Sequence, residues 1–163
     1  MPVLDLPQEQ AMTAEPYEAA RLRWVEFKDI AGLVRLYKAA RADSAEDTES
    51  MEDWLERGGA LVLENSYGEM LCALRYCEEG NGWRVDRIAT HPSARSQGYG
   101  RWLMTKVEAL AIRNNIPTLT LTLDEVRDDL LQYYQRMGYR VLEQDSHEVT
   151  LEKRVGGMWQ YKK

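Results

Sequence analysis

Apolar and polar positions follow two different periods along this chain, and the changes of period mark the predicted elements. Apolar residues recur at helical spacing in four segments, at residues 30–37, 51–55, 98–113 and 130–137. Short apolar or alternating runs predict strands at residues 22–26, 60–64, 70–76, 83–90, 118–123, 141–142 and 149–151. The run Thr118–Leu123 alternates strictly, which indicates a strand with one polar face.

Turn residues separate these segments. Asn65-Ser66-Tyr67-Gly68 and Glu79-Gly80-Asn81-Gly82 predict tight turns, so residues 60–90 are expected to form a meander of three strands. Asp29 is the expected N-cap of the first helix. Residues 41–49 are polar and acidic, which predicts a surface loop after that helix.

The order of elements is strand, helix, helix, three strands, helix, strand, helix and two strands. This order predicts an α/β (α+β) fold with a mixed central sheet of about seven strands and about four helices. A length of 163 residues suits one domain, which we assign to residues 21–155. Residues 1–20 are interpreted as an N-terminal leader and residues 156–163 as a C-terminal tail.

Composition excludes several classes of function. The net charge of −6 argues against a nucleic-acid-binding surface, and no apolar run approaches the roughly 20 residues of a membrane span. Cys72 and Cys77 stand five positions apart in one predicted strand, about 16 Å, which is too far for a disulfide. Free thiols and the lack of a signal peptide predict a cytoplasmic protein. His91 and His147 show no metal-ligand spacing, so no metal is expected.

The segment Ile88–Arg101 carries the clearest chemical signal, because a strand end, a Pro break and a Gly-rich loop precede a helix there. Unpaired N–H groups and the dipole make a helix N-terminus an anion site, usually for phosphate. A P-loop would need Lys and Ser or Thr after Gly100, where Arg101 and Trp102 stand. A Rossmann loop would need a third glycine where Leu103 stands.

Arg95-Ser96-Gln97-Gly98-Tyr99-Gly100 matches the pattern Arg/Gln-x-x-Gly-x-Gly/Ala and resembles the coenzyme A pyrophosphate loop of the GNAT superfamily of N-acetyltransferases. The order of elements is also that of the GNAT fold. The resemblance implies acetyl-CoA as co-substrate, bound by this loop and by the backbone of the strand before it. The residues it implies are Ile88, Ala89, Thr90, Arg95, Ser96, Gln97, Gly98, Tyr99, Gly100 and Arg101. The alternative is a plain tight turn between a strand and a helix.

A second block, residues 133–139, is similar to the family's Leu/Phe-Tyr-x-x-x-Gly-Phe/Tyr. Tyr134 falls on the tyrosine of that pattern, which the resemblance implies is the catalytic acid for the leaving thiolate. A phenol with a pKa near 10 is protonated at neutral pH and can supply that proton. The alternative role for Tyr134 is a core aromatic, and Tyr133 is interpreted as packing.

The sequence departs from better-defined relatives at two positions. Thr122 stands where some members have a glutamate, so no general base is assigned, and Arg127 replaces a frequent coenzyme-contacting asparagine. The resemblance implies an enzyme in which a primary amine attacks directly in a ternary complex. The alternative is a non-catalytic acyl-CoA-binding or regulatory module.

The acceptor is an unidentified amine. The acidic stretch Asp43–Glu49 favours a cationic one. The oligomeric state stays open, with a homodimer as one option, since the aromatic tail Met158–Tyr161 offers interface surface.

Overall fold

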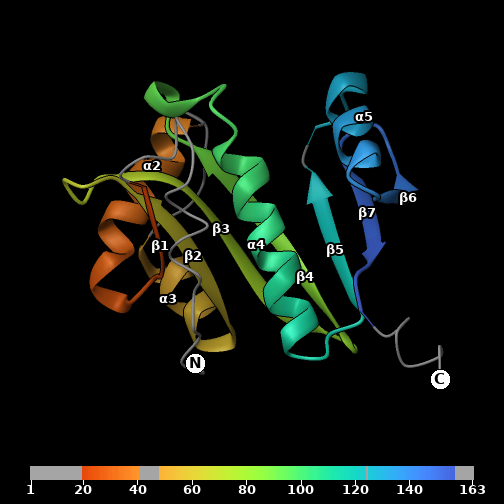
Figure 1. Ribbon diagram of the computed structural model, residues 1–163, viewed down its shortest axis with the longest axis horizontal. Helices are drawn as coiled ribbons and strands as arrows, with labels where there is room; N and C mark the ends of the chain where they lie inside the picture. The colour runs from red at the N-terminus through yellow and green to blue at the C-terminus, as the bar shows by residue number, and fades with distance from the viewer. Residues whose placement is uncertain (1–19, 41–47, 124, 157–163) are drawn as a thin grey trace. The chain divides into compact units, whose positions relative to one another are not determined.

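The computed structural model describes residues 20–40, 48–123 and 125–156, and Figure 1 shows the path of the chain. In these residues seven strands form one mixed sheet in the order β1-β2-β3-β4-β5-β7-β6, in agreement with the predicted mixed sheet. The strands are β1 (Arg21–Trp24), β2 (Gly58–Glu64), β3 (Met70–Glu79), β4 (Gly82–Thr90), β5 (Thr118–Leu123), β6 (Arg140–Gln144) and β7 (Val149–Arg154). The helices are α2 (Ile30–Ala40), α3 (Thr48–Arg57), α4 (Tyr99–Arg113) and α5 (Asp128–Arg136), with the 3₁₀ turns η1 (Phe27–Asp29) and η2 (Pro92–Ala94).

The chain divides into two compact units. The first comprises the described residues up to Arg75 together with Arg87–Thr105, and the second comprises Tyr76–Asp86 and the described residues from Lys106 onward. Three elements, β3, β4 and α4, therefore contribute residues to both units. Each unit has its own buried apolar residues and is described separately below.

In the first unit, the apolar stripe predicted for α2 faces the core. β1 pairs with β2 in antiparallel register, with Leu22 opposite Leu63. Ile30, Leu33 and Leu36 are each at most 3% exposed. They belong to one core cluster whose other buried members are Tyr37, Met51, Ala60, Val62, Ala73 and Ala89.

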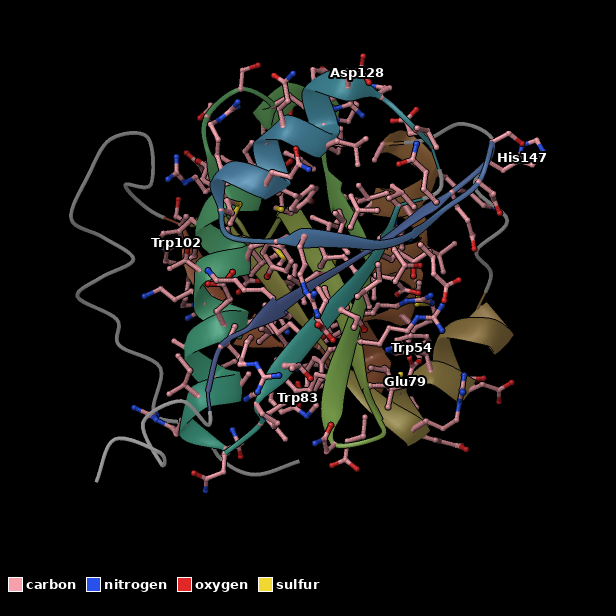
Figure 2. All side chains as sticks on the ribbon, turned by 90° about the vertical axis from the view of Figure 1, so that its right-hand side faces the viewer. Trp54, Glu79, Trp83, Trp102, Asp128 and His147 are labelled. Carbon is pink, nitrogen blue, oxygen red and sulfur yellow. The ribbon has the colours of Figure 1, made fainter. Side chains whose placement is uncertain are left out.

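In the second unit, the alternation of Thr118–Leu123 has the predicted consequence. Leu119 and Leu121 are buried, whereas Thr118, Thr120 and Thr122 are only partly buried, as is the last residue, Leu123. β5 pairs in parallel with the start of β4 and antiparallel with β7, which lies beside it in Figure 1. A parallel neighbour requires a long crossover, and the chain supplies it through α4. Figure 2 shows His147 at the tip of the hairpin that joins β6 to β7.

The N-cap prediction for Asp29 is wrong. Asp29 is the last residue of η1, whose N-cap is Glu26, and α2 begins one residue later, at Ile30. The Asp29 carboxylate accepts the backbone N–H of Glu26 at 2.8 Å and two N–H groups of Arg23 at 2.8 and 2.9 Å. Glu26 and Asp29 form a reciprocal capping box for η1, so Asp29 caps this turn from its third position and not as the N-cap.

Other boundaries move by a few residues. β1 ends at Trp24 instead of residue 26, and the predicted loop 41–49 is too long, because Thr48 and Glu49 already belong to α3. The rest of that loop lies outside the described residues, as do residues 1–19 of the leader and the tail segment Met158–Tyr161. Ala20 is buried, and the N–H of Gly156 donates to the carbonyl of Pro117 at 3.1 Å.

The cysteines and the helices can be compared with the predictions about disulfides and membrane spans. Cys72 and Cys77 are both free thiols, and Cys72 is buried. Among the helices in the described part of the chain, none combines the length and the apolar character that a membrane crossing requires.

Candidate active site

The segment between β4 and α4 is a compact turn built on His91. The imidazole Nδ1 of His91 accepts the backbone N–H of Ser93 at 3.1 Å, and the His91 carbonyl accepts the N–H of Ala94. The chain then passes through two left-handed residues, Ser96 at φ +66° and Gly98 at φ +83°. A non-glycine residue at positive φ is uncommon, so Ser96 is held there by its surroundings.

α4 follows this turn directly. Its first α-helical hydrogen bond runs from the N–H of Trp102 to the carbonyl of Gly98, at 3.0 Å. The helix is 15 residues long, so its macrodipole and its first-turn N–H groups are aimed at the Gly-rich turn. Successive N–H groups in a turn that visits the left-handed region form an anion-binding concavity. The local backbone therefore has the form of an anion-binding turn.

The two glycines of the turn have different requirements. Gly98 needs its left-handed φ, which a side chain would strain by roughly 1–2 kcal/mol. A Cβ at Gly100 would lie 3.8 Å from Oγ1 of Thr90, an ordinary contact. The protein itself therefore leaves room for a methyl group at residue 100. A requirement for glycine there would come from a bound ligand.

The two arginines of the loop also differ. Arg95 donates from Nη2 to the carbonyl of Ala40 at 2.7 Å and from Nε to the carbonyl of Thr90 at 3.4 Å. Its guanidinium thus ties the C-terminus of α2 to the end of β4, where a cation also complements the helix dipole. Arg101 is exposed in the first turn of α4. The structure gives Arg95 a structural contact that the sequence did not reveal.

The predicted strand contacts lie at the end of β4. Ala89 is buried in the core cluster, whereas Ile88 and Thr90 are partly buried. Oγ1 of Thr90 donates to Sγ of Cys72 at 3.4 Å. Burial raises the pKa of the Cys72 thiol to about 11, so this thiol stays protonated and is a poor nucleophile.

Tyr134 lies in the second unit, on α5, and is only 5% exposed. Its ring meets the rings of Tyr133 and Tyr139 edge to face, with centroids 5.0 and 5.8 Å apart. The interpretation of Tyr133 as a packing residue is consistent with this contact. Buried edge-to-face pairs fix ring orientation and stabilise by about 0.5–1.5 kcal/mol each.

A polar group that sequence reasoning missed supports these rings. The hydroxyl of Tyr139 donates to Oε2 of Glu108 at 2.8 Å, and Nζ of Lys153 donates to Oε1 at 3.0 Å. Burial, followed by the nearby Glu108 carboxylate, holds the pKa of Tyr139 well above its usual value. A signal was present in the sequence, since Glu108 stands between the apolar positions Val107 and Leu110 of α4.

The two departures from the family pattern also lie in the second unit. Thr122, which stands where some family members have a glutamate, pairs with Thr150 between β5 and β7 and is a regular strand residue. Arg127 is held by Asp129 through two hydrogen bonds of 2.8 and 3.1 Å and by Glu125 at 3.0 Å. These carboxylates already neutralise Arg127. Among the described residues, no cluster of His, Cys, Asp and Glu could hold a metal ion.

The sequence pattern of the GNAT acetyltransferase domain matches residues 56–141, which is 86 of the 163 residues. The chain belongs to the GNAT family. The matched range contains both the turn before α4 and Tyr134. Comparison with curated proteins gave no match.

Solved structures share the GNAT fold with this chain at low sequence identity. The ribosomal-protein-S18-alanine N-acetyltransferase from Escherichia coli has a TM-score of 0.76 and 15% identity, over 85% of this chain and 95% of that one. The PaiA N-acetyltransferase from Thermoplasma acidophilum, in complex with coenzyme A, has a TM-score of 0.67 and 13% identity, over 83% and 98%. An acetyltransferase from Thermus thermophilus has a TM-score of 0.68 and 14% identity, over 83% and 97%. These likenesses establish the GNAT fold.

Proposed function

We propose that this GNAT protein transfers the acetyl group of acetyl-CoA to a primary amine by direct attack in a ternary complex. The observation that carries the proposal is the turn Ser96–Gly98, whose two left-handed residues lead straight into the N-terminus of α4. This turn would receive the pyrophosphate of acetyl-CoA. The backbone of Ile88, Ala89 and Thr90 would pair with the pantetheine arm.

The coenzyme-binding part of the proposal rests on the chemistry of the turn. A diphosphate needs several N–H donors that converge without intervening side chains. Gly98 and Gly100 supply backbone without a Cβ. The space that a Cβ would occupy at residue 100 is open, and the nearest contact it would make is at 3.8 Å. Arg101 is exposed one residue later and would add a positive charge. Arg95 would act mainly by fixing the turn against α2, through its bond to the carbonyl of Ala40.

In the acetyl-transfer step, the amine nitrogen forms a bond to the thioester carbonyl carbon. The carbon–sulfur bond then breaks and the sulfur leaves as a thiolate. Tyr134 would donate its phenolic proton to that sulfur, so that coenzyme A departs as a thiol. The amine loses its proton to water, because Thr122 carries no group that titrates at neutral pH. The products are an acetamide and free coenzyme A.

The proposed acceptor is a primary amine, and its protonation predicts how the reaction depends on pH. The alanine N-acetyltransferase from E. coli acts, by its name, on an amine of a protein, and it shares only the fold with this chain. A protonated amine has no lone pair and must lose its proton before it reacts. We therefore expect kcat/KM to rise with pH through the range in which free amine forms, and a flat profile from about pH 6 to 9 would contradict direct attack.

A non-catalytic acyl-CoA-binding module is the rival function. The phenol at residue 134 favours the enzyme, because a protein that only binds has no use for a proton donor there.

The two free thiols, Cys72 and Cys77, suit our further proposal that the protein works in a reducing cytoplasm.

The deciding experiment incubates the purified protein with acetyl-CoA and a panel of primary amines, polyamines and peptides. Thiol release and the mass of the acetylated product are measured together, which separates amine transfer from simple hydrolysis. Product from at least one amine supports the enzyme. Tight acetyl-CoA binding with no turnover on any amine, and no hydrolysis, supports the binding module.

A further inference from the structure

The first unit contains an open pocket that the proposed acetyl-transfer chemistry does not use. Its volume is about 580 Å³, within the range of small-molecule sites. Its lining residues come from β1, η1 and α2, from the turn between β2 and β3 with the first residue of β3, and from His91 after β4. None of the ten residues proposed to bind acetyl-CoA lines it.

Part of the lining is apolar and kept open by a glycine. Gly32, Leu36, Ala39 and Met70 supply the apolar surface. Gly32 stands inside α2, where glycine costs roughly 1 kcal/mol relative to alanine, and its backbone has no left-handed φ that would require glycine. A Cβ at residue 32 would lie 3.2 Å from Cε of Met70 and 3.6 Å from Nη2 of Arg35. Gly32 therefore preserves space beside a guanidinium.

Two carboxylates belong to the lining, and Asp29 is already paired with a cation. Both oxygens of Asp29 accept N–H groups of Arg23, and this pairing lowers the pKa of Asp29. Glu69 accepts the side-chain amide of Asn65 at 2.7 Å. Arg23 also pairs with Glu64 at 3.0 Å, so Arg23 is occupied as well.

Three further side chains of the lining, Lys28, Arg35 and His91, are donors. Arg35 is exposed and makes no hydrogen bond or ion pair within the described part of the chain. Lys28 makes an exposed contact with Glu26 at 3.4 Å and also lies close enough to Asp29 to help lower the pKa of that carboxyl. Nδ1 of His91 accepts the N–H of Ser93, which places the proton of the neutral ring on Nε2 and makes that nitrogen a donor. An anion would satisfy all three groups.

We propose that this pocket binds a small carboxylate with a short apolar body. The carboxylate pairs with the guanidinium of Arg35, with His91 and Lys28 as further donors. The apolar part packs against Leu36, Ala39 and Met70 in the space that Gly32 leaves. Arg35 suits this role because a guanidinium matches a carboxylate in a two-pronged geometry.

The test uses butyrate as the probe and butanamide as its uncharged equivalent. The full chain is labelled with ¹³C at the methionine methyl groups, and the Met70 resonance is assigned with Met70→Leu. Butyrate should shift the Met70 methyl resonance with saturation, whereas butanamide and inorganic phosphate should bind at least about tenfold more weakly. Equal binding of butanamide, equal binding of phosphate or the absence of a saturable butyrate shift would each overturn the proposal.

Variants locate the interaction. Arg35→Gln should weaken butyrate at least about tenfold, and Gly32→Ala should weaken it by filling the space. Lys38→Gln is the matched control, because Lys38 is an exposed cation of the same helix that does not line the pocket. Arg35→Gln with wild-type affinity would refute the role of Arg35. Saturating coenzyme A should leave butyrate bound, and displacement would assign the pocket to the coenzyme instead.

Discussion

The hydroxyl of Tyr139 donates a hydrogen bond of 2.8 Å to Oε2 of Glu108. This bond joins the connection between α5 and β6 to helix α4. Lys153 of β7 donates to the other oxygen of the same carboxylate. The Glu108 carboxylate of α4 thus binds both β7 and the connection between α5 and β6. Tyr139 also supports the ring of Tyr134, the proposed acid, through an edge-to-face contact.

Replacing Tyr139 by Phe removes this bond and keeps the ring. A hydrogen bond to a charged group is worth about 1.5–3 kcal/mol, so we expect the free energy of unfolding at neutral pH to fall by that amount. The pKa of Tyr139 is raised in the folded state, so its contribution is present below the unfolded pKa of about 10 and lost as pH rises beyond it.

Urea unfolding measured at neutral pH and above about pH 10 checks both effects. The wild-type free energy of unfolding should decrease more steeply with alkaline pH than that of Tyr139→Phe. Tyr67→Phe is the control, because Tyr67 is 86% exposed. An unchanged alkaline slope in Tyr139→Phe would show that this phenol does not couple to folding.

Tyr134→Phe tests the proposed proton donor. We expect kcat to fall at least about tenfold, because general acid catalysis typically contributes about 100- to 10,000-fold and water supplies part of the proton. Acetyl-CoA affinity should hardly change, since the ring and its packing remain. Tyr133→Phe is the matched control on the neighbouring residue. A wild-type kcat for Tyr134→Phe would leave Tyr134 a packing role alone.

Gly100→Ala separates the needs of the protein from those of the coenzyme. The added methyl meets only Oγ1 of Thr90, at 3.8 Å, so thermal stability should not fall. If acetyl-CoA approaches this backbone, its affinity measured by calorimetry should nevertheless drop at least about tenfold. Unchanged affinity would remove Gly100 from the binding site.

Gly98→Val carries a second cost, because residue 98 has φ +83°. We expect a loss of stability of roughly 1–2 kcal/mol and a loss of acetyl-CoA affinity. Gly80→Ala is the control, with φ +64° and nothing within 4 Å of its added Cβ. It should lose stability and keep affinity. A folded Gly98→Val protein with wild-type affinity would exclude this turn as the pyrophosphate site.

Asp29→Asn tests the ion pair between Arg23 and Asp29 at the start of the first helical segment. The bonds from Arg23 hold the pKa of Asp29 below its usual value, so its contribution is present above the unfolded pKa of about 3.9 and lost as pH falls below it. We expect Asn to lower the free energy of unfolding by about 2 kcal/mol at pH 7 and to flatten its acid dependence. Urea titrations down to about pH 3 measure this slope, and equal slopes would contradict it.

The sequence by itself determined the order and type of the elements, because periodicity of apolar residues is a local property. Thr118–Leu123 alternates and forms β5, and the Gly-rich segment before Tyr99 opens α4. The sequence also predicts the candidate site residues, because the motifs around Gly98 and Tyr134 consist of residues that are neighbours in the chain. The family match over residues 56–141 rests on the same local information.

Only the tertiary structure decided which distant residues meet. Arg95 donates to a carbonyl 55 positions away in the sequence, and Lys153 donates to Glu108, 45 positions away. Charged side chains look alike in a sequence whether they face solvent or a partner, because the pairing energy depends on distance and burial. The fold sets both the distance and the burial of each charge. It therefore decided that Arg95 binds the carbonyl of Ala40, and that Arg35 has no partner among the described residues and lies beside Gly32.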